Sequence, residues 1–81
     1  MAGEYVRLQQ ALAQHAMPGG RKVAAQAMRE YLIAEGSNAS LASLGLNEAY
    51  PNIMPLDTLP DRIESDPEFA KLMHSVVNNV Y

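Results

Sequence analysis

The sequence predicts an all-α fold, a small helical bundle in which residues 1–81 form a single domain. Two observations support this prediction. Apolar residues recur three or four positions apart in three segments of the chain, and Gly or Pro residues separate these segments. We expect an N-terminal antiparallel helical hairpin, a short third helix, a Pro-rich ordered loop and an amphipathic C-terminal helix.

The expected hairpin consists of helices at residues 3–17 and 21–35, joined by Pro18, Gly19 and Gly20. Pro cannot continue the hydrogen-bond ladder of the first helix, and Gly tolerates a positive φ, so the chain should turn sharply here. The apolar stripe of the first helix is Tyr5, Leu8, Leu12 and Ala16, flanked by Val6, Ala13 and Met17. That of the second is Val23, Ala24, Ala27, Met28, Tyr31 and Ala34. These stripes should face each other.

The second half of the chain is expected to begin with a short helix at residues 41–46, followed by an ordered loop at 47–60. That loop holds three Pro residues, yet it is too apolar for a free linker, and a short helical turn is expected near 59–64. The C-terminal helix should start at Asp66, an N-cap residue, with Pro67 in its first turn. Its expected apolar face is Phe69, Leu72, Met73, Val76, Val77 and Val80.

Composition limits the classes of function that the chain can have. It has no Cys and a formal net charge of −3 at pH 7, which argues against bulk affinity for nucleic acid. The first ten residues include charged and polar side chains and no apolar run, and no later run is long enough to span a membrane. We therefore expect no signal peptide, no membrane span and a cytoplasmic protein. Residues 1–34 carry four Lys/Arg and two carboxylates, whereas residues 35–81 carry two Lys/Arg and seven carboxylates. This uneven distribution of charge favours docking onto a partner in one orientation.

No pattern indicates catalysis, a metal or a cofactor, and we expect none of the three. His15 and His74 have no second ligand at helical spacing, so they are interpreted as helix-edge histidines that meet only if the first and last helices pack together. The acidic residues after position 56 lack the spacing of a calcium loop. The segment from Gly19 to Lys22 is either an exposed hairpin turn or an anion site, since Arg21 and Lys22 follow free backbone amides.

The function that these features favour is a small non-enzymatic protein–protein interaction module: an adaptor, an assembly or virion component, or an inhibitor of a larger complex. Its size is typical of a bacterial or phage accessory protein, and its thin core predicts a homo-oligomer. The alternative is a small nucleic-acid-binding transcriptional regulator that uses Arg7, Arg21, Lys22 and Arg29. This is not favoured, because the segment after Gly36 lacks a basic recognition helix.

The candidate partner-binding residues belong to two segments of the chain. Ile33 projects on the same side as the cations of its helix, so it either joins a contact face or packs under the following loop. The apolar residues of that loop either form a docking site or cover the core. The full set of candidates is Arg21, Lys22, Arg29, Ile33, Tyr50, Ile53, Met54 and Leu56.

Overall fold

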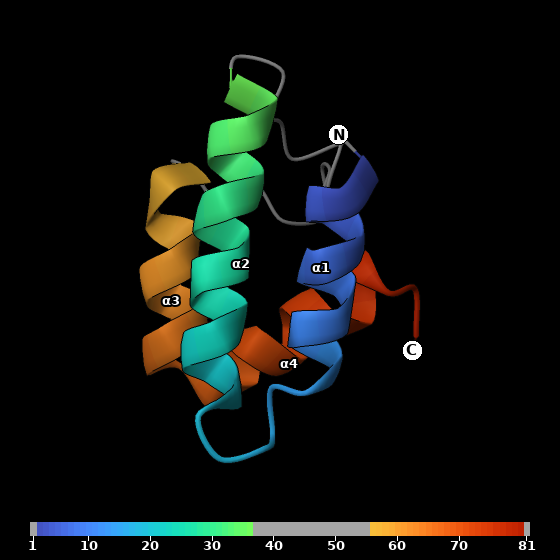
Figure 1. Cartoon of the computed structure of the whole chain (residues 1–81). Coiled ribbons are helices and arrows are strands. Elements are labelled where there is room, and N and C mark those ends of the chain that lie inside the picture. Colours follow the sequence, from blue (N-terminus) through green and yellow to red (C-terminus); the bar gives the residue numbers. More distant parts are fainter. Residues whose placement is uncertain (1, 37–55, 81) are drawn as a thin grey trace.

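The computed structural model describes residues 2–36 and 56–80 (Figure 1). Its elements are α1 (Ala2–Ala13), α2 (Gly20–Glu35), the 3-10 turn η3 (Leu56–Thr58), α3 (Leu59–Ser65) and α4 (Pro67–Val77). These residues include no strand, and the predicted all-α fold is confirmed. The short helix expected at 41–46 lies outside the described residues, and so do Tyr50, Ile53 and Met54.

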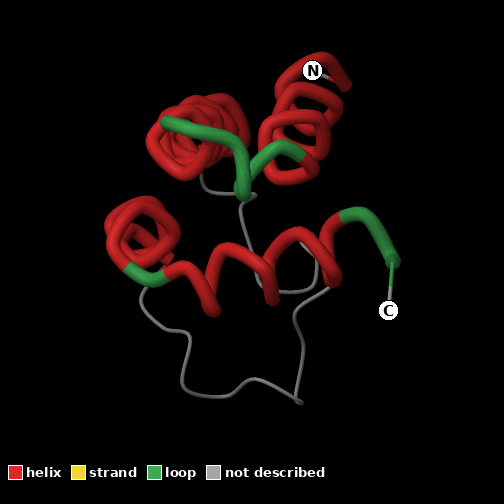
Figure 2. Tube along the Cα trace, turned by 90° about the horizontal axis from the view of Figure 1, so that it is seen from below, coloured by secondary structure: helices red, strands yellow, loops and turns green. Residues whose placement is uncertain are grey.

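The helices are arranged around α2. It runs antiparallel to α1, as predicted, and packs against α1 on one side and α3 on the other (Figure 1). The last helix, α4, lies crosswise to these three and packs against both α3 and α1 (Figure 2). The first and last helices of the chain are therefore in contact. Among the described residues, no helix is long and apolar enough to cross a lipid bilayer.

The predicted end of the first helix, at residue 17, is wrong, because α1 stops at Ala13. Its last turn tightens through a bond from the Gln14 amide to the Ala11 carbonyl, 3.1 Å, and the chain then turns over residues 14–19. Gly19 has a φ of +73°, which glycine adopts at little cost. Gly20 is buried against the backbone of Gln14, so the chain must leave the helix early to allow this close approach.

The core is built from apolar side chains, five of which are Ala, and its two aromatic members are Tyr31 and Phe69. Its buried members are Leu8, Ala11, Leu12, Ala24, Ala25, Ala27, Met28, Tyr31, Leu59, Ile63, Phe69, Ala70, Met73, Val76 and Val77. Three Val residues assigned to apolar stripes are instead exposed, Val6 at 45%, Val23 at 61% and Val80 at 48%. Ala13, Ala16, Met17 and Ala34, assigned to the same stripes, are exposed as well. Because α2 packs between α1 and α3, its buried arc includes Ala25 and stops short of Val23.

The start of α4 is as predicted. The Asp66 carboxylate accepts hydrogen bonds from the amides of Glu68, at 3.0 Å, and Phe69, at 3.3 Å, and Pro67 occupies the first turn. The helical turn expected near 59–64 is α3, with Pro60 early in it. The Arg62 guanidinium lies 4.1 Å from the centre of the Phe69 ring, which adds a cation–π contact between α3 and α4.

Candidate functional site

The side of α2 that points away from the core carries exposed aliphatic side chains. Ile33 is 81% exposed and Val23 is 61% exposed, and their positions along the helix place them on the same side. The outer face of α2, as we define it, is Lys22, Val23, Gln26, Ile33 and Ala34, all of which are exposed. Ten positions, about 15 Å of helix, separate Ile33 from Val23, and Gln26 lies between them. Exposed aliphatic side chains beside a cation can form part of a surface that binds another protein.

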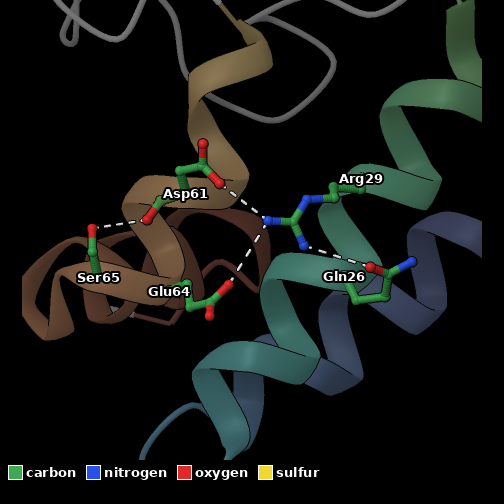
Figure 3. A network of polar contacts seen from close by, with 5 residues as sticks. All are labelled: Gln26, Arg29, Asp61, Glu64 and Ser65. Carbon is green, nitrogen blue, oxygen red and sulfur yellow. Dashed lines mark hydrogen bonds and ion pairs between the residues drawn. The ribbon is translucent and has the colours of Figure 1, made fainter.

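Ion pairs on either side of this face tie α2 to its neighbours. Arg7 of α1 pairs with Glu30 of α2. On the other side the Arg29 guanidinium lies 3.1 Å from the Asp61 carboxylate and 3.8 Å from that of Glu64, both in α3 (Figure 3). These pairs are open to water, so each contributes at most about 1 kcal/mol to stability. Their main effect is that Arg7 and Arg29 already have carboxylate partners within the chain.

Gln26, a residue of the outer face, forms hydrogen bonds with Arg29 and Glu30. Its amide nitrogen donates to the Glu30 carboxylate at 3.3 Å. Its amide oxygen accepts from Arg29 at 3.5 Å, as Figure 3 shows. Arg29 thus contacts α3 and also a residue of its own helix. The candidate partner-binding residue Arg29 is therefore positioned as a link between α2 and α3 rather than as a free cation.

A second feature is an open cavity of about 640 Å³ between the α1–α2 turn and the α3–α4 junction. Its charged lining consists of the cations Arg21, Lys22 and Lys71 and the carboxylates Glu64 and Glu68. The two carboxylates offset most of the positive charge of the three cations that line the cavity. Of the two interpretations of the Gly19–Lys22 segment, this geometry favours the exposed hairpin turn over the anion site.

His15, which lines the same cavity, lies beside His74. Their ring centres are 5.5 Å apart, because α4 packs on α1 and so brings His74 beside the residue two positions after α1 ends. Burial lowers the pKa of His15, and the neighbouring His74 and Lys71 lower it further. A search of residues 2–36 and 56–80 finds no cluster of three or more side chains able to bind a metal ion.

The candidate residues are only partly brought together. Lys22 and Ile33 share the outer face of α2, and Lys22 also lines the cavity together with Arg21. Leu56 packs half-buried against the core. Val23 was missed as a candidate because helical spacing alone places it at the border of the apolar stripe. Whether Val23 is buried or exposed depends on where α3 packs against α2, and the local sequence pattern does not indicate that packing.

Comparisons of the chain with protein-family models, curated proteins and solved structures found no match in any of the three. Its function is therefore inferred from its own residues and their geometry.

Proposed function

We propose that the protein is a small non-enzymatic protein–protein interaction module and that the outer face of α2 is its contact surface. The observation that carries this proposal is the exposure of Ile33, at 81%, on the same side as Val23. Burying one such aliphatic side chain against a partner gains about 1.5–3 kcal/mol, enough for a central contact residue. Adaptors, assembly or virion components and inhibitors of larger complexes use surfaces of this kind, and a bacterial or phage accessory protein fits the size.

The charge around the face favours a particular partner chemistry. Lys22 lies at the N-terminal end of the face without an ion-pair partner among the described residues, and Arg21 is its neighbour in the chain. A partner with an apolar patch and an adjacent carboxylate would complement both features. The cations would mainly speed and orient association, and the aliphatic contacts would supply most of the affinity.

Binding to nucleic acid is less well supported than binding to protein. Of the four cations that a regulator would use, Arg7 and Arg29 are engaged with Glu30, Asp61 and Glu64. Arg21 and Lys22 share their cavity with two carboxylates. Few cations remain to neutralise phosphates, so filter binding to DNA should be weak at low salt. Tight binding that weakens steeply with salt would instead support the regulator.

The test of the proposed face compares two double variants of matched chemistry. Val23→Ser with Ile33→Ser removes the aliphatic side chains of the outer face, whereas Val6→Ser with Val80→Ser removes two other exposed Val side chains. Arg29 is left in place because it links α2 to α3. Each tagged protein is used to capture partners from lysate of the native host, and the affinity of each identified partner is then measured by calorimetry.

We expect the control variant to bind like the wild type and the face variant to lose at least tenfold in affinity, about 1.4 kcal/mol. The melting temperature of the face variant should stay within a few degrees of the wild type, because both residues are exposed. Unchanged affinity in the face variant would contradict the proposal. So would a large fall in its melting temperature, which would assign Ile33 to the core.

A further inference from the structure

The C-terminal end of α4 is held on α1 by polar contacts. The carbonyl of Val77, in the last turn of α4, has no partner within the helix, and it lies 3.3 Å from both the Tyr5 hydroxyl and the Gln9 side-chain amide. The Asn78 side-chain amide donates in return to the Gln9 carbonyl, at 3.0 Å. Burial, and to a lesser degree Tyr31, raises the pKa of Tyr5, so this hydroxyl keeps its proton and remains a donor.

These contacts constrain which ring nitrogen of His74 can accept a hydrogen bond. The carbonyl of Gln9 can only accept, so the nitrogen of the Asn78 amide, and not its oxygen, must face it. The same nitrogen lies 2.9 Å from Nδ1 of His74. Its second hydrogen therefore points at Nδ1, which must carry a lone pair. The contact therefore fits the tautomer of His74 that carries its proton on Nε2.

The surroundings of the two rings do not favour a second positive charge. His15 faces His74 from the end of α1, and Lys71 approaches from α4. The start of α2 adds Arg21 and Lys22 to the cavity that His15 lines, while Glu64 from α3 and Glu68 from α4 are its carboxylates. The structure pairs neither of these carboxylates with a histidine; Glu64 lies 3.8 Å from Arg29.

From this geometry we propose that the contact between α1 and the end of α4 is an acid-sensitive latch, opened by protonation of the His15–His74 pair. A proton on Nδ1 of His74 would point at the N–H of Asn78 and break the 2.9 Å contact. The resulting imidazolium would also lie beside His15. Separation of α4 from α1 would expose Val76 and Val77, which are now buried. The hydrogen bonds of the latch involve no residue of the outer face of α2, and the latch does not depend on the proposed function.

The direction of the pH effect follows from His15. Its pKa is lower in the folded protein than its usual value near 6.5, so the unfolded chain binds this proton more readily. The stability that the neutral ring contributes is fully present above about pH 6.5. It is lost progressively as the pH falls from there through the lowered pKa. The latch should accordingly be closed at neutral pH and should open under mildly acidic conditions.

Nuclear magnetic resonance on the wild-type chain tests the latch without a substitution. Nitrogen shifts of the imidazole rings should show His74 with its proton on Nε2 at about pH 7.5. Amide exchange, corrected for intrinsic rates, should speed up about tenfold at residues 76–80 between about pH 7.5 and 5.5. Residues 24–31 of α2 should keep their protection. A proton on Nδ1 at neutral pH, or equal changes in both segments, would overturn the proposal.

A variant test separates the histidines from the carboxylates. The double change His15→Gln with His74→Gln should abolish the acid-induced exchange at the end of α4, and Glu68→Gln, at the same cavity, should leave it in place. Acid-induced opening that persists in the double histidine variant would overturn the latch. If that variant fails to fold, the wild-type measurement decides alone.

Discussion

Replacing Gly20 by Ala tests the close approach that shapes the hairpin. A Cβ at this position would overlap the carbonyl oxygen of Gln14 and would lie 3.0 Å from its carbonyl carbon and 3.1 Å from that of His15. All three are backbone atoms, which cannot rotate away as a flexible side chain can. The α1–α2 turn must therefore shift, at the cost typical of overpacking, about 1–3 kcal/mol. In a domain of this size that lowers the melting temperature by roughly 4–24 °C.

Two matched glycines serve as controls for this variant. Nothing lies within 4 Å of a Cβ at Gly3 in α1, so Gly3→Ala should be neutral or stabilising by up to about 1 kcal/mol. Gly19 has equal space but a φ of +73°, so Gly19→Ala should cost about 1 kcal/mol through backbone strain alone. Thermal unfolding followed by circular dichroism ranks the three variants. A Gly20→Ala protein as stable as Gly3→Ala would refute the close approach.

Three further predictions concern the core, the cap and association. Leu12 is fully buried, so Leu12→Ala should cost about 2–4 kcal/mol in chemical denaturation, and a loss near zero would contradict the packing of α1 on α2. Asp66→Ala should cost about 1 kcal/mol, because it removes the acceptor of the Glu68 and Phe69 amides, and unchanged stability in chemical denaturation would contradict the cap. Sedimentation at micromolar concentration should show a dimer or larger species that salt weakens, and a monomer throughout would exclude self-association.

Sequence reasoning succeeded where a feature is local. The start of α4 depends on Asp66 and Pro67 alone, and both act within the first turn of the helix. In the structure Asp66 caps the helix and Pro67 occupies its first turn, as predicted. It failed at the end of α1, because Ala16 and Met17 continue the helical spacing although the chain has already turned. The cause is the packing of Gly20 on Gln14, six residues away, which an apolar pattern does not encode.

The candidate site was predictable to a similar extent. The projection of Ile33 away from the apolar stripe follows from helical spacing, and its side chain is exposed. The partners of Arg29, by contrast, come from α3, 32 or more positions along the chain, and no spacing rule connects them. The meeting of His15 with His74 likewise depends on the crossing of α4 over α1. Contacts between distant elements require the tertiary arrangement.

The contact between α1 and α4 also has a consequence for the order of folding. Its hydrogen bonds join residues 68–72 positions apart, whereas only the six residues 14–19 separate α1 from α2. Closing a flexible segment of about 70 residues costs roughly 4 kcal/mol in chain entropy, against about 1.5 kcal/mol for six. We therefore expect the hairpin to form early and the first and last helices to meet late, a sequence that pulse-labelled amide exchange can follow.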